Sequence, residues 1–462
     1  MSKEIPVILR KLGDSEKFHV SRMLERTHAN VTITAKLKHT SRSETPCKQF
    51  YLDTLYPAIA KLLEIHPRLA ITIAEADQPS AHFIHLSSLD MSDIVRVYEE
   101  PDLPNVQEVI AQECRTNFDF HSPLPLWRLR VDVHSPQLEE CHITLTMHHA
   151  IGDGMSLLFF WQDLVKYLDD PSSKVHPDNY RLKPKCESLA PPFEQRQPPK
   201  MTARVFAGAI CEVFVNKLPK PLAKRFKHNW EGDYPVKSGF GYSEVRLVQL
   251  DGEVWQSLVS RAKQHGISVH AALNTAMVLA WAELYPGRRV QTSTAVNCRR
   301  LCNPPVGHEM GNFVGEYDYG WKPKDFRKGF WTLAKQYHET LHQNKSIAAL
   351  KVLLLGYLED YPREYQAYWK ELRDSHQLGR SGGLCLSDLG KCTFENKHWD
   401  VQGVWFSQSA FTMTVPIVVS AITVNGCMRA TVVWQKGALD ATKADAFPGH
   451  WLDRLRKASS EQ

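Results

Sequence analysis

Residues 141–168 place a β-strand directly before a helix that must be buried, and this order constrains the fold more than any other part of the chain. CHITLTMHH has the composition of a strand, and AIGDG supplies a turn with two glycines. MSLLFFWQDLVKYL follows at helical length and is apolar nearly all round. A helix without a polar face is buried in the core of a protein. The segment therefore predicts a mixed α/β fold for this part of the chain.

The length of the chain predicts more than one domain. A single hydrophobic core stops growing at roughly 250–300 residues, and this chain has 462. We expect an N-terminal lobe over 1–170, a Pro-rich linker and crossover helix over 171–238, and a C-terminal lobe over 239–462. The two lobes show similar alternation of strand-like and helix-like segments, which suggests two comparable halves, each a mixed β-sheet flanked by helices.

Composition excludes several classes of function. The net charge is only +5 and the basic residues are scattered, so nothing indicates nucleic acid. No window reaches the ~18 apolar residues of a membrane span, and the charged start of the chain lacks the apolar core of a secretory signal. Ten thinly spread cysteines are typical of reduced thiols. We therefore expect a cytoplasmic protein.

One segment of the sequence is compatible with contact at a membrane surface. Residues 202–228 run from an apolar stretch into a basic one, a pattern that could lie on a membrane surface such as that of the ER or a lipid droplet. The pattern is weak, and we favour a crossover helix packed on the domain, with a solvated basic end.

The paired histidines at the end of the strand are the candidate chemical groups. An imidazole exchanges a proton near neutral pH because its ordinary pKa is about 6.5. The carboxyl edge of a sheet is where open α/β folds commonly build their sites. Gly152 and Gly154 allow close approach of a ligand to the backbone, and their N–H groups lie near a helix N-terminus, which favours negative charge. A base beside such donors suits acyl transfer through an oxyanion.

Two other interpretations compete. His148 and His149 are neighbours on a strand, so they point to opposite faces and would not normally bind one metal ion. No third ligand cluster stands out, because Cys298 with Cys302 and Cys385 with Cys392 do not form CxxC pairs. We therefore predict no metal. A histidine pair satisfied within the core stays open, although a carboxylate and two glycines beside it favour a functional turn.

The stretch His148–Gly154 resembles the HHxxxDG signature of the chloramphenicol-acetyltransferase-like superfamily. The resemblance extends along most of the chain, and the fungal alcohol acetyltransferases fit best. The further matching segments are HPRLAITI (66–73), PLWRLRV (125–131), AVNCR (295–299), GNFVGEY (311–317), LSDLG (386–390) and the strands over 406–434. The resemblance implies two chloramphenicol-acetyltransferase-like lobes with an active-site tunnel between them.

The same resemblance implies roles for individual residues. His149 would be the general base, and His148 would shape the turn. Asp153 would be structural and would pair with an arginine of the other lobe, for which Arg299 is the candidate over its neighbour Arg300. Further residues would contact the oxyanion or the acceptor: the Gly154 backbone N–H, Ser407 and Gln408. A solvent-facing polar pair is the equal alternative for the last two.

The implied activity is acyl transfer from acyl-CoA, such as acetyl-CoA, to a small-molecule alcohol or amine, in secondary metabolism or detoxification. It needs no bound cofactor and no covalent enzyme intermediate, and nothing in the sequence looks like a nucleophile elbow, in which the serine turn follows a strand and opens a helix. Three alternatives stay open: a condensation-type enzyme that uses a carrier-protein thioester, a thioester or ester hydrolase, and a catalytically silent binding or scaffold member. Two lobes in one chain complete a site, so we expect a monomer.

Overall fold

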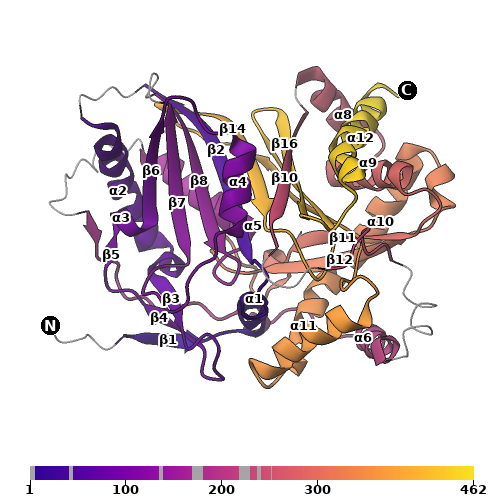
Figure 1. Cartoon of the computed structure of the whole chain (residues 1–462), viewed down its shortest axis with the longest axis horizontal. Helices are drawn as coiled ribbons and strands as arrows, with labels where there is room; N and C mark the ends of the chain where they lie inside the picture. The colour runs from indigo at the N-terminus through magenta and orange to yellow at the C-terminus, as the bar shows by residue number, and fades with distance from the viewer. Residues whose placement is uncertain are drawn as a thin grey trace.

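Two large β-sheets lie side by side in the computed structural model (Figure 1). The structure describes residues 6–40, 45–134, 139–168, 180–217, 229–236, 241–250 and 252–461. The parts of the predicted linker and basic segment at 171–179 and 218–228 lie outside the described residues. The mixed α/β architecture predicted from the sequence is confirmed.

The first sheet carries the paired histidines on a central strand. Its strand order is β14-β2-β8-β7-β6. The bounds are β14 (Trp399–Gln408), β2 (Asn30–His39), β8 (Glu140–His148), β7 (Trp127–His134) and β6 (Val95–Glu100). Helix α5 (Gly154–Leu168) follows β8 and packs against α2 (Cys47–Ile65) in the core of this half. The near absence of a polar face on α5 thus reflects its burial, as predicted.

Small elements surround this first sheet. A three-stranded sheet has the order β1-β4-β3, and β5 pairs with β9. The bounds of these and the remaining N-terminal elements are β1 (Ile8–Lys11), α1 (Asp14–Leu24), β3 (Ile71–Ala74), β4 (His82–His85), β5 (Leu89–Asp90), α3 (Met91–Ile94), α4 (Val106–Arg115) and β9 (Arg181–Leu182).

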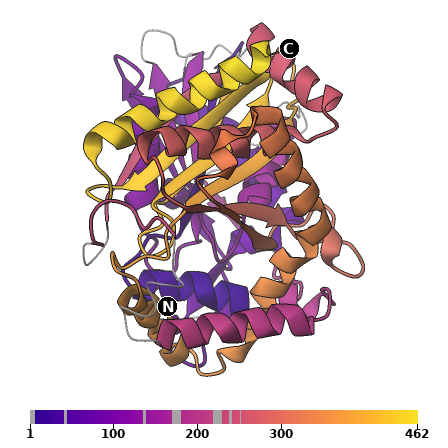
Figure 2. The ribbon, with the colours of Figure 1, turned by 90° about the vertical axis from the view of Figure 1, so that its right-hand side faces the viewer.

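The second sheet has one face covered by helices. Its order is β10-β16-β15-β13-β11-β12. The strands are β10 (Ser243–Leu250), β16 (Cys427–Gln435), β15 (Ile417–Val424), β13 (Leu384–Cys392), β11 (Val290–Asn297) and β12 (Val314–Trp321). The helices that pack with it in the second core are α8 (Gly252–Gln264), α9 (Val269–Leu284), α10 (Phe330–Leu353) and α12 (Ala441–Ser460). They lie together beside the sheet in Figure 2. On the opposite face β10 packs against α4, β15 and β16 pack against β14, and β11, β12 and β13 line the cavity described below.

Strand β14 crosses from the C-terminal half of the chain into the first sheet. It pairs antiparallel with β2 along its length, with Ser407 opposite Thr32. The sequence assigned residues 239–462 to the C-terminal lobe, but these ten residues lie in the sheet of the other half. Pairing of β14 with the free edge of β2 completes the N-terminal sheet and ties the halves together.

Helix α6 (Ala203–Lys217) lies beside α11 (Arg363–Ser375) and α10. Phe206, Ile210 and Phe214 of α6 are exposed, and they line the large cavity described below. The crossover helix favoured from the sequence is therefore present, with an apolar side at that cavity. Among the described residues no single helix is long and apolar enough to span a membrane, and α8 with α9 passes that test only as a pair bent by 108°.

Gly315→Ala should destabilise the protein, because β12 lies against the backbone of α10 at this residue. An added Cβ would lie 2.4 Å from the carbonyl oxygen of Ala348. Overpacking of this kind costs about 1–3 kcal/mol. Gly320→Ala on the same strand is the matched control, since nothing lies within 4 Å of its Cβ position. Denaturant unfolding should separate the two variants, and equal stabilities would contradict this contact.

Candidate active site

The paired histidines end β8 at the turn that leads into α5. The turn is closed by the Ile151 N–H, which donates to the carbonyl of His148 at 3.1 Å. Asp153 Oδ1 then accepts from the backbone N–H of Ser156 at 2.9 Å, which caps the first turn of α5. The sequence pattern of strand, glycine-containing turn and buried helix is therefore present as predicted.

His148 and His149 have different surroundings, as the alternation of a strand requires. His148 is fully buried, and its Nδ1 accepts from the backbone N–H of Ala150 at 3.1 Å. Its ring meets the edges of Phe118 and Phe120. Burial and the neighbouring His149 lower the pKa of His148 to about 3. His148 therefore holds the turn from inside the core and does not line the cavity.

His149 lines a cavity of about 1400 Å³ to which both halves of the chain contribute. Its ring stacks on His19 of α1, with centroids 4.1 Å apart. Asn312 donates from Nδ2 to the His149 carbonyl at 3.0 Å and lies 3.3 Å from Nδ1. The Nε2 atom has no side-chain hydrogen-bond partner among the described residues. One nitrogen of this imidazole is thus left to meet a ligand.

The surroundings of His149 keep the ring neutral. Burial, followed by the nearby Arg22, lowers its pKa to about 4, although Asp153 and the carbonyls of His149 and Gly152 act in the opposite direction. A neutral imidazole can accept a proton at physiological pH. The same ring would lose this ability only in acid.

Asp153 and Arg299 form a buried two-point ion pair between the halves. Arg299 Nη1 lies 2.7 Å from Asp153 Oδ2, and Nη2 lies 3.0 Å from Oδ1. Asp153 also accepts from the backbone N–H of Phe313 at 3.0 Å. Burial opposes ionisation of Asp153, but Arg299 and these hydrogen bonds hold its pKa below the ordinary value. The pair suggested for Arg299 from the sequence is therefore present, and Arg300 is exposed.

Arg299 also fixes the loop that approaches His149. Its guanidinium donates to the carbonyls of Glu309 and Gly311 at 3.1–3.2 Å. Ser156 closes the same network, because its hydroxyl donates to Gly311 O at 2.9 Å and accepts from Gly311 N at 3.0 Å. The ion pair thus holds the residues next to Asn312, which in turn contacts His149.

Gly154 begins α5 at the wall of the cavity. A Cβ at this position would lie 2.7 Å from Leu389 and 3.1 Å from Phe406, so only glycine fits without a shift. The first N–H groups of a helix have no partner within the helix. The Gly154 backbone is therefore placed to face a ligand in the cavity.

Ser407 and Gln408 lie on opposite sides of β14. Gln408 lines the cavity and donates to Ser420 at 3.3 Å. Ser407 is fully buried with its hydroxyl 3.9 Å from the sulfur of Cys114, and it is not part of the cavity wall. Gln408 can therefore contact a ligand in the cavity, as the sequence suggested. Ser407 lies away from the cavity, so its position does not support such a contact. Neither residue faces solvent.

Several cavity residues carried no signal in the sequence. His19 and Arg22 come from α1, whose many polar residues would be typical of an exposed helix. Glu316 and Asp318 come from β12. Asn312 contacts His149 without lining the cavity, and it falls inside GNFVGEY, a segment that gives no role to single residues.

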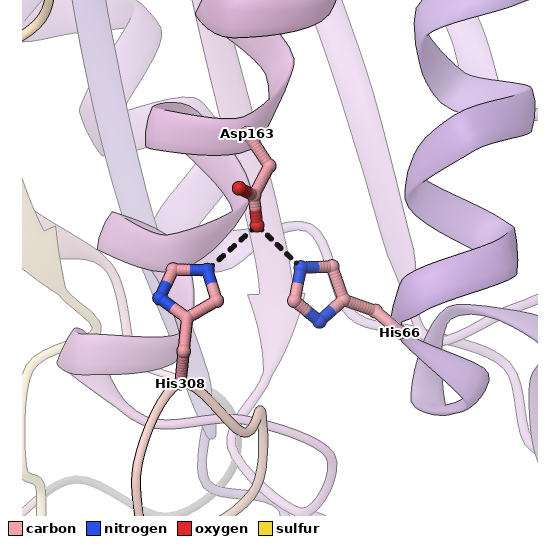
Figure 3. Close-up of side chains that lie close together, drawn as sticks. All are labelled: His66, Asp163 and His308. Atoms are coloured by element: carbon pink, nitrogen blue, oxygen red, sulfur yellow. Dashed lines mark hydrogen bonds and ion pairs between the residues drawn. The ribbon is translucent and has the colours of Figure 1, made fainter.

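One cluster outside the cavity has the composition of a metal site. His66, Asp163 and His308 offer ligand atoms within 4.8 Å of one another, as Figure 3 shows. His66 Nε2 and His308 Nε2 lie 2.8 and 2.7 Å from the same carboxylate oxygen. These are hydrogen-bond distances, so two imidazole N–H groups already satisfy the carboxylate. The contact joins α5 to the loop before Gly311 and was not predicted from the sequence.

If His149 is the base of an enzyme, Asn312→Ala should lower kcat by about tenfold to hundredfold, because small displacements of a reacting group are costly. The variant removes the amide that holds the His149 carbonyl and lies beside Nδ1. Steady-state kinetics should show the loss mainly in kcat. Asn303→Ala in the same loop is the control, since its amide makes only an exposed contact at 3.4 Å. Equal kcat values for the two variants would contradict a positioning role.

A two-lobed mixed α/β fold, with a histidine at a strand-to-helix turn inside a cavity lined by both halves, is the architecture of the chloramphenicol-acetyltransferase-like superfamily. The chain belongs to the alcohol acetyltransferase family, which it matches over residues 11–448. It is 24% identical to the probable alcohol acetyltransferase FCK4 of Fusarium pseudograminearum, over 94% of this chain and 92% of that protein.

Solved structures share the fold at low sequence identity. The TRI3 trichothecene 15-O-acetyltransferase of Fusarium sporotrichioides has a TM-score of 0.70 at 11% identity, covering 97% of this chain and 94% of that one. The epimerization domain of the third module of tyrocidine synthetase B has a TM-score of 0.63 at 13% identity, covering 98% and 96%. These matches confirm the two-lobed fold expected from the sequence.

Proposed function

We propose that this protein transfers a short acyl group, with acetyl as the first candidate, from acyl-CoA to the hydroxyl group of a small-molecule alcohol. The observation that carries the proposal is His149, a neutral imidazole on the wall of a cavity that both halves line. Membership of the alcohol acetyltransferase family supports an acetyl donor and an alcohol acceptor.

The proposed step is direct attack assisted by a base. His149 Nε2 takes the proton of the acceptor hydroxyl as its oxygen bonds to the thioester carbonyl carbon. The tetrahedral intermediate carries its negative charge on the former carbonyl oxygen. When the intermediate collapses, the carbon–sulfur bond breaks and the CoA thiolate receives the proton from the His149 imidazolium. The products are an ester and CoA, and no bond to the enzyme forms.

Two groups are placed to assist this step. The N-terminus of α5 at Gly154 presents backbone N–H groups and a positive dipole end, which suits the oxyanion. Gln408 lies on the same cavity wall, and its amide can donate to the oxyanion or bind the acceptor.

Other functions of this fold predict different products. An N-acyltransferase would form an amide, and a hydrolase would use the same base to activate water. A condensation-type enzyme would need a carrier-protein thioester in place of acyl-CoA. A binding or scaffold member would consume no thioester, and His149 would then have no chemical need to be neutral and accessible to a ligand.

The test is product analysis with purified protein, a panel of acyl-CoAs and pooled alcohols and amines. Mass spectrometry reads the products directly, which avoids interference from the exposed thiols of Cys186 and Cys211 in a dye assay. The proposal expects esters of a short acyl group. Amides alone, free acid alone, or no consumption of any acyl-CoA would reject it in favour of the corresponding alternative.

A further inference from the structure

The wall of the cavity formed by the second sheet is polar and acidic. Side chains of β11, β12 and β13 that point away from the covering helices line the cavity: Ser293, Ala295, Glu316, Asp318, Cys385 and Ser387. Ala295 lies opposite Glu316 in the sheet, and Ser293 lies opposite Asp318. The residues between them, such as Tyr317, pack into the helical core instead. The wall is therefore one face of a regular sheet.

The two carboxylates of this wall are not equally satisfied. Asp318 forms an ion pair with Lys351 of α10 and accepts from the hydroxyl of Ser293 at 2.6 Å. Glu316 has no cationic side chain within 4 Å among the described residues. Its side chain is exposed to the cavity although protein surrounds it. Glu316 thus lacks an ion pair within the described part of the chain and faces the cavity.

Arg22, Glu316 and His149 all line the same cavity. The Arg22 guanidinium lies over the ring of Phe411 at 4.7 Å and donates to the carbonyl of His28 at 2.9 Å. From there its charge acts on both His149 and Glu316. Burial and Asp318 raise the pKa of Glu316 to about 7, against the opposing effects of Lys351, a hydrogen bond from Ser293 and Arg22. A carboxyl group without an ion pair to any described residue therefore shares the cavity with His149, and its burial among other groups disfavours its ionised form.

The chemistry of the two substrates decides which of them suits this group. Acyl-CoA carries phosphates, which a carboxylate repels; its pantetheine arm also has amide N–H and hydroxyl donors, but a contact with that arm would serve all acceptors equally. An acceptor that carries a second donor group, either a hydroxyl or an ammonium, would satisfy the carboxylate. Hydrogen bonds to a charged acceptor are stronger than those to a neutral one. A site that binds a donor group of its substrate also discriminates against analogues that lack this group.

We propose that Glu316 binds a second hydrogen-bond-donating group of the acceptor, so that the acceptor is a diol or an amino alcohol. The proposal rests on the acyl transfer described above and specifies the acceptor class of that same site. The reacting hydroxyl meets His149, and the second group meets Glu316.

The test compares acceptors that share one carbon skeleton. One has a single hydroxyl, one has a second hydroxyl, and one has an amine, each at several spacings. For the wild type, the best bifunctional acceptor should exceed the single alcohol by about tenfold to hundredfold in kcat/KM. Glu316→Ala should remove that advantage and leave the single alcohol within about threefold. Glu316→Gln should keep part of the diol preference, because its amide oxygen still accepts, and lose the preference for the amine.

Glu253→Gln is the matched control, since Glu253 is an exposed carboxylate at the start of α8 on the covered side of the sheet. The Glu316 variants should unfold at or above the wild-type Tm, because they remove a charge that has no ion pair. Equal use of single and bifunctional alcohols by the wild type would overturn the inference while acyl transfer stands. Equal loss on all acceptors in Glu316→Ala would also overturn it. Failure to acylate any alcohol would reject the transfer itself.

Discussion

Replacing His149 by alanine should lower kcat by about 10²–10⁴-fold, the range expected for loss of a general base. The physical reason is that His149 is the neutral imidazole on the wall of the large cavity, with Nε2 free of side-chain partners among the described residues. The Tm should change little, because the lost ring contact with His19 lies at the cavity wall. Initial rates of ester formation at saturating acyl-CoA measure the effect.

His142→Ala is the control for this variant. His142 lies on the same strand, is also largely buried, and does not line the cavity. Its variant should keep kcat within about threefold of the wild type. A similar loss in both variants would mean that damage to β8, and not loss of a base, explains the result.

The pH profile of the wild type offers a second check on His149. The base acts only when it is unprotonated, and burial with Arg22 lowers its pKa to about 4. The rate should therefore be flat from neutral pH down to about pH 5 and fall as the pH drops through the lowered pKa. A fall centred near the ordinary histidine value of about 6.5 would contradict this environment for the ring.

Removal of Arg299 should have the largest effect on stability. Arg299→Ala leaves the buried Asp153 carboxylate without its cation, and breaking a buried pair typically costs 3–5 kcal/mol. The variant also frees the loop at Glu309 and Gly311, so kcat should fall together with stability. Chemical denaturation and steady-state rates measure the two losses.

Arg300→Ala is the natural control, because Arg300 is the exposed neighbour and forms no such pair. It should match the wild type within about 0.5 kcal/mol. Asp153→Ala combined with Arg299→Ala should cost less than the sum of the single changes, since the pair is shared. Additive losses would show that the two groups are not coupled.

The ion pair also predicts how stability depends on pH. The pKa of Asp153 is lower in the folded protein than its ordinary value, so its ionisation stabilises the fold above that ordinary value. The stabilisation is lost as the pH falls through the lowered pKa. In Arg299→Ala the main cause of the lowering is gone, so acid unfolding should begin at higher pH. Identical acid transitions in both proteins would contradict this linkage.

The sequence predicted the local geometry of the histidine turn better than it predicted the sheets. Strand β8, the glycine turn and buried helix α5 follow from patterns within 28 residues. The place of β14 in the first sheet does not follow from a local pattern. An apolar strand can pair with either sheet, and the pairing is decided only by the free edge of β2. Long-range pairing of this kind has no local signal.

Side-chain direction limited the prediction of the site in the same way. A strand has two faces, so Ser407 and Gln408 could not both face the cavity, and only the register of β14 with β2 decides which one does. His19 and Arg22 are polar residues on α1 that are buried at the cavity wall, where His19 stacks on His149 and Arg22 lies over Phe411. Their roles depend on the other half of the chain.

The most direct test of the account follows one labelled acyl group. Isotopically labelled acetyl-CoA is mixed with purified protein, an equal amount of alcohol and amine acceptors, and water as the solvent, and the label is located by mass spectrometry. Direct acyl transfer predicts labelled ester formed in equal amount to free CoA, with His149→Ala lowering both together. Label found only in free acetate, or retained in acetyl-CoA by the wild type with every acceptor offered, would contradict it.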